Sequence, residues 1–363
     1  MIDLSDRQWL LESGEDPVFG SFRRPGILSG PDGRIIACYE GHRRDSRKQQ
    51  LIARISDDAG GHWSDRIVLA EGGATGMLHN VMFAWAEGWY YCLWNVQYRQ
   101  LWVRRSRDGV HWESPRDLTR SLWRADCDFP WNAFGIGSGH CTTLENGRIL
   151  IPTWFTTGGD SHKPSAFGCI YTDDLFETVG IGRTLADGVG LRNPNEGAIA
   201  RLGDGNILAT VRHDNDQRFR ALTVSRDGVD AWQTPWFCEQ LPDPICHAAM
   251  LGLTPDKDGA EGLLFSNCAN ADPDWRVKHE AGLSRYLWSD DARKNLVVRF
   301  SRDGTNFSQG ISLADKAGYS DLACAAGTVV CIYETAWDLE ETCVAPHALG
   351  VTRVPLKTIL SEP

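Results

Sequence analysis

Residues 106–112 read Ser-Arg-Asp-Gly-Val-His-Trp, and four other segments repeat this order of a hydroxylated residue, an Asp, a turn and an aromatic ring. The five segments span residues 56–63, 106–112, 172–176, 225–232 and 301–307, so their starts lie 50, 66, 53 and 76 residues apart. A repeat of this size indicates stacked or radially arranged units. It therefore decides the fold class before any local propensity is considered.

Each repeated segment has the chemistry of a tight turn between two strands. Asp accepts hydrogen bonds from backbone N–H groups and Gly tolerates a positive φ, while the aromatic ring can pack beneath the turn. A β-rich run precedes each turn, at residues 51–55, 101–105, 167–171, 220–224 and 296–300. One such segment would be an ordinary hairpin, but five in the same position predict a unit of strand, turn, aromatic plug and next strand.

The length of the chain fits about six of these units, of roughly 60 residues each. Many turns and large rings, with 37 Gly and 15 Trp, suit short strands, and no long segment shows the apolar period of a helix. We predict an all-β, six-bladed β-propeller of four-stranded antiparallel blades. Residues 1–18 are predicted as an N-terminal arm, residues 19–363 as a single propeller domain, and the polar residues from about 270 to 292 as a long loop.

Composition excludes several classes of function. The net charge of -11 argues against nucleic acid as a partner, and no apolar run is long enough for a transmembrane helix. The first residues carry acids rather than the basic head of a signal peptide, so we expect a cytoplasmic protein unless a leader was removed. The 11 Cys lack a CxxC motif and the 10 His lack ligand spacing, so no metal and no cofactor are expected.

The repeated turn resembles the Asp box of the sialidase (neuraminidase) superfamily, whose members are six-bladed propellers. Asp boxes also occur in propellers without this activity, so they imply the fold and not the function. The rest of the family pattern has to be sought in other segments. Similar segments occur from about residue 20 to residue 335, nearly the whole chain.

Three arginines that bind the substrate carboxylate are implied by this resemblance. Phe22-Arg23-Arg24-Pro25 is similar to the family's opening aromatic-Arg-Ile-Pro element, which implies Arg23 as the first arginine. Arg24 stands in a slot that is apolar in the family, so the choice between Arg23 and Arg24 stays open. The resemblance implies Arg212 and Arg293 as the second and third arginines, Arg43 as a further substrate ligand, and Glu334 as the acid that orients the first arginine.

The catalytic residues are implied in the same way. Tyr319, in Gly318-Tyr-Ser-Asp-Leu322, takes the position of the nucleophile, and Glu196, in Asn193-Pro-Asn-Glu-Gly197, matches the glutamate that activates it. Asp45 is the only Asp between Arg43 and the first Asp box, in a loop shorter than usual, and matches the acid/base. A neutral phenol suits a substrate that carries a carboxylate beside the reacting carbon, because an anionic nucleophile would be repelled.

The resemblance implies a retaining exo-α-sialidase that hydrolyses terminal α-linked sialic acid. Two alternatives stay open: an enzyme of the same fold acting on another acidic sugar, such as a deaminated sialic acid or a uronate, by hydrolysis or elimination, and a non-catalytic carbohydrate-binding propeller. Taken singly, these residues also fit ordinary roles, since an Arg can form a surface ion pair, a Tyr can plug a core and Glu196 can cap a turn. Trp123, Asp126 and Asp128 fit either a sugar pocket or packing.

Overall fold

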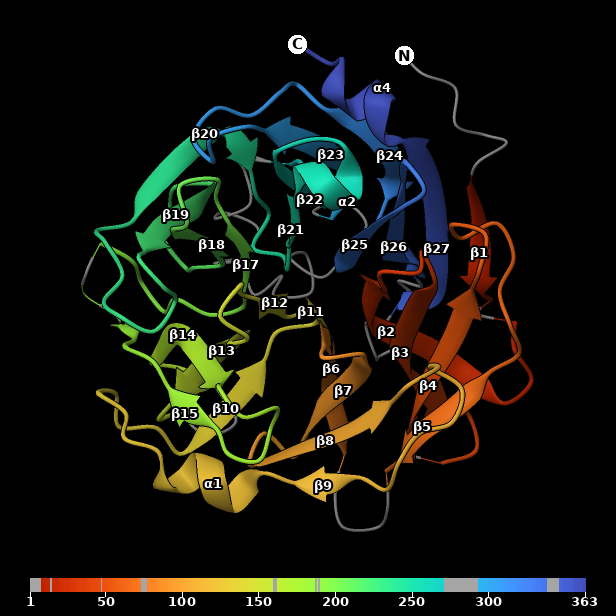
Figure 1. Cartoon of the computed structure of the whole chain (residues 1–363), viewed down its shortest axis with the longest axis horizontal. Helices are drawn as coiled ribbons and strands as arrows, with labels where there is room; N and C mark the ends of the chain where they lie inside the picture. Colours follow the sequence, from red (N-terminus) through yellow and green to blue (C-terminus); the bar gives the residue numbers. More distant parts are fainter. Residues whose placement is uncertain are drawn as a thin grey trace, which may run out of the picture.

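The computed structural model of the protein describes residues 8–13, 15–46, 48–72, 77–158, 162–186, 188, 190–270, 293–337 and 346–363. Its strands form six small sheets arranged in a ring, which confirms the predicted six-bladed β-propeller (Figure 1). Within these residues, no helix has the length and apolar character needed to cross a membrane. The predicted loop lies outside the described residues except for Asn270.

The first three blades follow one another along the chain. The first contains β2 (Phe19–Ser29), β3 (Ile35–Arg43), β4 (Gln49–Ser56) and β5 (Ile67–Glu71). The second contains β6 (Leu78–Ala86), β7 (Trp89–Val96), β8 (Gln100–Ser106) and β9 (Arg116–Asp117), with β11 (Gly139–His140) added in parallel to β6. The third contains β10 (Ala133–Ile136), β12 (Thr142–Thr143), β13 (Ile149–Thr156), β14 (Ser165–Thr172), β15 (Gly180–Ile181) and β16 (Leu185–Ala186).

The remaining blades complete the ring. The fourth contains β17 (Gly197–Arg201), β18 (Ile207–Val211), β19 (Phe219–Ser225) and β20 (Trp236–Pro242), and the fifth contains β21 (Ala249–Leu253), β22 (Gly262–Cys268), β23 (Lys294–Ser301) and β24 (Ile311–Lys316). The sixth contains β25 (Ser320–Ala325), β26 (Thr328–Trp337), β27 (Pro346–Pro355) and β1 (Gln8–Glu12). The helices within the described residues are α1 (Thr119–Arg124), α2 (Pro255–Asp258) and α4 (Leu356–Leu360).

The five repeated turns connect the third and fourth strands of the first five blades, as their sequence predicts. In each, the carboxylate of the central Asp accepts backbone N–H groups further along the turn; Asp108, for example, accepts from Val110 at 2.9 Å and His111 at 2.8 Å. The hydroxyl of the first residue accepts another, as Ser106 does from Gly109 at 2.8 Å. The sixth blade has no such turn because its fourth strand, β1, comes from the other end of the chain.

Neighbouring blades are held together by apolar packing. Six clusters of buried side chains are found among the described residues, and each joins strands of two adjacent blades. Between the first and sixth blades, for example, Phe22 and Ile27 of β2 pack with Val330 and Ile332 of β26. Because each blade depends on its two neighbours, the ring has to close for the last interface to form.

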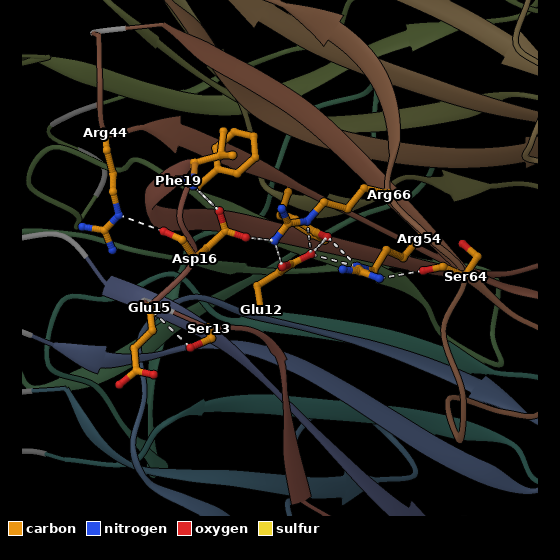
Figure 2. Close-up of polar contacts among 11 residues, drawn as sticks. Glu12, Ser13, Glu15, Asp16, Phe19, Arg44, Arg54, Ser64 and Arg66 are labelled. Atoms are coloured by element: carbon orange, nitrogen blue, oxygen red, sulfur yellow. Dashed lines mark hydrogen bonds and ion pairs between the residues drawn. The ribbon is translucent and has the colours of Figure 1, made fainter.

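The ring closes through β1, which lies within the predicted N-terminal arm. This strand pairs antiparallel with β27 and becomes the outer strand of the sixth blade (Figure 1). Its last residue, Glu12, is 3% exposed and accepts hydrogen bonds from Arg54 at 2.8 Å and from Arg66 at 3.0 Å (Figure 2). It also accepts a hydrogen bond from the Tyr39 hydroxyl. Tyr39 and Arg54 belong to the first blade, so one carboxylate ties the two ends of the ring together.

The charge of Glu12 is stabilised by these partners. Burial alone would raise its pKa, but the hydrogen bonds from Arg66 and Arg54 outweigh burial and hold the pKa below its ordinary value. Arg66 also contacts Asp16 at 2.6 Å, which keeps the chain after β1 against the first blade (Figure 2).

We predict that Glu12→Gln lowers the free energy of unfolding at pH 7 by about 2–3 kcal/mol, because it removes a buried carboxylate that neutralises two guanidinium groups. Urea unfolding of the variant and of the wild type measures the difference. Glu15→Gln, at an exposed position of the same segment, should leave the stability unchanged.

The difference in the free energy of unfolding between the wild type and Glu12→Gln should decrease as the pH falls. Since the folded state lowers the pKa of Glu12, its contribution is complete above the unfolded pKa of about 4.3 and is lost as the pH falls through the folded value. A difference that is absent at pH 7, or that grows toward low pH, would contradict this role for Glu12.

Candidate active site

A cavity of about 400 Å³ opens where the first residues of several inner strands meet. It is lined by side chains from blades one to four and six: Arg23, Arg24, Asn80, Tyr98, Trp154, His162, Lys163, Asn193, Asn195, Glu196, Arg212, Asp214 and Tyr319. Four residues named from the sequence, Arg23, Glu196, Arg212 and Tyr319, are therefore brought to one cavity although they come from three different blades.

Tyr319, Glu196 and Arg212 are in direct polar contact in this cavity. The Tyr319 hydroxyl donates to Glu196 Oε1 at 2.5 Å, and Arg212 Nη1 lies 2.5 Å from Glu196 Oε2 and 3.1 Å from the Tyr319 oxygen. Glu196 immediately precedes β17 and Arg212 immediately follows β18, so the hairpin between these strands places the two side chains together. The backbone continues the pairing, because Arg212 N–H donates to Glu196 O at 2.9 Å.

The environment shifts the pKa values of Glu196 and Tyr319 in opposite directions. Burial opposes the charge on Glu196, but Arg212, with His247 and the Tyr319 hydroxyl, outweighs burial and lowers its pKa to about 2. For Tyr319, burial and then the negative charge of Glu196 raise the pKa well above its ordinary value. The pair is thus a neutral phenol that donates to a carboxylate, which is the resting state of a hydroxyl nucleophile with its base.

Arg23 and Arg24 both face the cavity because β2 is irregular at this point. In a regular strand, successive side chains point to opposite faces, but the register with β3 shifts between Arg23 and Gly26, and Arg24 has a left-handed φ of 49°. The bulge turns the second side chain toward the same side as the first.

Each of these arginines has its own buried carboxylate. Arg24 Nη1 contacts both oxygens of Glu40, at 3.1 and 2.9 Å. Arg23 Nε donates to Glu334 Oε1 at 3.5 Å, and the other oxygen of Glu334 accepts the backbone N–H of Tyr319 at 3.1 Å. Glu334 thus links Arg23 to the strand that carries Tyr319, which is the position that the sequence resemblance implies for it.

Arg293 lies behind the phenol rather than in the cavity lining. Its side chain is fully buried, its guanidinium carbon is 5.4 Å from the centre of the Tyr319 ring, and its Nη2 donates to Ile245 O at 3.4 Å. The third predicted arginine is therefore close to Tyr319, on the side of the fifth blade.

Arg43 and Asp45 are not brought to the cavity. They pair with each other at the surface, where Arg43 Nη2 lies 2.9 Å from an Asp45 carboxylate whose side chain is 64% exposed. Hydrogen bonds from Arg43 and then Ser46 lower the pKa of Asp45 to about 2. The turn that carries Asp45 is short, because Arg43 N–H already bonds to Lys48 O at 3.1 Å, and this keeps its tip on the outside. The roles of both residues stay predictions.

The aromatic wall of the cavity was missed in the sequence. Tyr98 and Trp154 lie with ring centres 5.4 Å apart, and His162 packs on both, at 4.8 and 4.9 Å. Tyr98 occupies the turn between β7 and β8, where it and Gln97 have positive φ values of 55° and 52° without a Gly. No Gly, Asn or Asp marks this turn, so it gave no signal that Tyr98 is presented to a site.

Trp123, Asp126 and Asp128, considered for a sugar pocket, do not line this cavity. Trp123 stacks on Trp131 with ring centres 4.1 Å apart. Asp128 accepts the backbone N–H of Thr184 at 3.1 Å. These contacts fit the packing alternative for Trp123 and Asp128.

Comparison with known proteins gives one family over most of the chain. Residues 33–332 match the BNR repeat-like domain family. Sialidase-3 of Rattus norvegicus is 26% identical over 282 residues, which cover 69% of this chain and 66% of that protein. A sialidase of Micromonospora viridifaciens is 23% identical over 286 residues, which cover 69% of this chain and 42% of that protein. The chain thus spans two thirds or less of the length of these relatives.

Solved structures share the fold. The Hadza microbial sialidase Hz136 superposes with a TM-score of 0.75 at 20% identity, over 97% of this chain and 69% of that one. A Trypanosoma rangeli sialidase in complex with 2,3-difluoro-KDN gives a TM-score of 0.72 at 17% identity, over 96% of this chain and 56% of that one. With the family match extending from β3 of the first blade to β26 of the sixth, the chain belongs to the BNR repeat-like domain family of the sialidase superfamily.

Proposed function

We propose that the protein is a retaining exo-α-glycosidase that removes a terminal sialic acid or a closely related acidic sugar from a glycoconjugate. The observation that carries this proposal is the 2.5 Å hydrogen bond between Tyr319 and Glu196, in a cavity that also presents Arg23 and Arg212. Pure binding of an anionic sugar would use the arginines but needs no phenol paired with a base.

Tyr319 is the proposed nucleophile. Its oxygen attacks the anomeric carbon, its proton passes to Glu196, and the bond to the leaving oxygen breaks as that oxygen takes a proton from an acid, for which the sequence predicts Asp45. In the second step the acid, now deprotonated, takes a proton from a water molecule, whose oxygen attacks the anomeric carbon. The bond between that carbon and the Tyr319 oxygen breaks, and Glu196 returns its proton to Tyr319. The configuration is retained because the carbon is inverted twice.

Binding of the substrate is proposed to activate Glu196. In the ligand-free protein Arg212 holds the pKa of Glu196 near 2, which makes Glu196 a weak base. A substrate carboxylate that docks on Arg212 shares its charge, so the pKa of Glu196 rises and the proton of Tyr319 can move. The base would then be strongest when an anionic sugar is in place.

Relatives support this choice of substrate. The Trypanosoma rangeli sialidase has been solved in complex with sialic acid, and as a covalent intermediate with 2,3-difluorosialic acid. These proteins are 16% identical to this chain, so the substrate of the present protein rests on its own cavity and has to be measured.

Tyr319→Phe should lower kcat on fluorogenic α-sialosides by about 10²- to 10⁴-fold, because it removes the nucleophilic oxygen and its proton. A panel of sialosides, deaminated analogues and uronides measures both the loss and the preferred sugar. Tyr171→Phe, in the third blade beside Arg148, is the matched control and should keep full activity. Unchanged turnover by Tyr319→Phe would rule out the proposed nucleophile.

Arg23→Lys should raise KM about 10- to 100-fold, because an ammonium group cannot replace the planar fork that binds a carboxylate and one charge-assisted hydrogen bond is worth about 1.5–3 kcal/mol. Steady-state kinetics on the preferred substrate measures the effect. Arg148→Lys, where Arg148 pairs with Asp173 on the outer surface, should leave KM as in the wild type. Equal KM values for all three proteins would mean that Arg23 does not bind the substrate.

Asp45→Asn tests the predicted proton donor. If Asp45 protonates the leaving oxygen, the variant should lose about 10²-fold or more in kcat on substrates with a sugar leaving group and little on those with an activated phenol, which needs no proton. The Arg43–Asp45 pair would have to open for this to occur. Equal rates for variant and wild type on both substrates would place the donor on another residue.

A further inference from the structure

His247 lies directly against the candidate nucleophile but is not part of the cavity lining. It follows Cys246 in the segment that leads into β21, and its side chain is 1% exposed. The segment is anchored, because the buried Arg220 donates to Cys246 O at 2.7 Å and the backbone N–H of Ile245 donates to Asp243 at 3.1 Å. The backbone immediately before His247 is therefore fixed by contacts within the protein.

The imidazole of His247 is stacked on the phenol ring of Tyr319. The ring centres are 5.0 Å apart and the planes differ by 28°, which is the offset stacking that aromatic pairs favour. The Tyr319 hydroxyl is held at its tip by Glu196 and Arg212, but those contacts leave the tilt of the ring open. Two groups pack on the ring and can restrict that tilt: the stacked imidazole of His247 and the Arg293 guanidinium, whose carbon is 5.4 Å from the ring centre.

The described residues do not use the hydrogen-bonding capacity of His247. Neither of its ring nitrogens has a hydrogen-bond partner within the described part of the chain, although a buried imidazole normally has one. Four charged groups surround it: the carboxylates of Glu196 and Asp321 and the guanidinium groups of Arg220 and Arg212. Burial, with the two guanidinium groups, outweighs the carboxylates and lowers the pKa of His247, so the ring is uncharged at neutral pH.

We propose that His247 is a positioning residue for the reaction: the face of its ring fixes the tilt of Tyr319 so that the phenol oxygen meets both Glu196 and the anomeric carbon. This inference rests on the proposed function of Tyr319 as nucleophile. The ring acts through its shape and not through its nitrogens, so another flat ring of similar size can replace it.

Two variants test whether the flat ring of His247 or its nitrogens are needed. His247→Ala removes the support and should lower kcat by about 30- to 100-fold with KM within about twofold of wild type, because a displacement of about 1 Å costs this much while the arginines stay in place. His247→Phe keeps the ring and should keep kcat within about threefold. It should also unfold at the same denaturant concentration as the wild type or higher, because two buried nitrogens without partners are removed.

Two further variants control for stability. His247→Leu fills most of the volume without a flat face and should be slow like His247→Ala, even if the alanine variant folds poorly. Phe307→Ala, a buried ring in the Asp box of the fifth blade, should lose stability but keep kcat. A general loss of packing would instead lower kcat in all destabilised variants alike.

Three outcomes would overturn the inference: kcat unchanged in both His247→Ala and His247→Leu, kcat as low in His247→Phe as in His247→Ala, or an effect on KM rather than on kcat. A wild type that turns over no acidic glycoside would instead remove the proposed function. In that case a crystal structure of His247→Leu still decides: a Tyr319 oxygen moved beyond 3.5 Å from Glu196 supports the positioning role, and an unmoved one refutes it.

Discussion

The contact between Tyr319 and Glu196 joins two blades, although the residues are 123 positions apart in the chain. Glu196 immediately precedes β17 of the fourth blade and Tyr319 immediately precedes β25 of the sixth. Neither blade places both groups by itself. Their approach is set by the packing between blades and by closure of the ring through β1 and Glu12. The chemistry of the cavity is thus a consequence of closure, and a chain that failed to close would separate the phenol from its base.

Charge balance around the cavity follows from the same arrangement. The protein carries a net charge of -11, yet arginines gather at one end of the channel. Each arginine lining the cavity is paired with a buried carboxylate: Arg23 with Glu334, Arg24 with Glu40 and Arg212 with Glu196. An anionic ligand therefore enters a site whose cations are already partly neutralised. In the proposed function, an anionic ligand would compete with Glu196 for Arg212, and this competition would link binding of the substrate to activation of the base.

Much of this architecture could be predicted from the sequence, because the Asp boxes mark a turn whose hydrogen bonds are local to each segment. Five boxes identify five blades, and the count of six follows from the length. Ring closure by β1 could not be predicted, since residues 8–12 carry no turn signal and pair with a strand from the other end of the chain.

Some residues of the candidate site could be predicted from the sequence and others could not. Tyr319, Glu196 and Arg212, which the family resemblance implied from short motifs at strand ends, lie together in the structure, and their roles stay predictions. Tyr98 and Trp154 reach the cavity through a turn without Gly and through packing between blades, for which a single sequence holds no local signal. Asp45 shows the opposite case, where position in the sequence suggests a site residue and the short turn keeps it at the surface.

In the proposed reaction, Tyr319 attacks the sugar and becomes covalently bound to it. The most direct measurement is mass spectrometry of the intact protein after incubation with a 2,3-difluoro sialic acid, followed by peptide mapping. We expect one added sugar per chain, attached to Tyr319, and no adduct on Tyr319→Phe. Attachment to another residue would rule out Tyr319 as the nucleophile, as would turnover of sialosides by a protein that never forms the adduct.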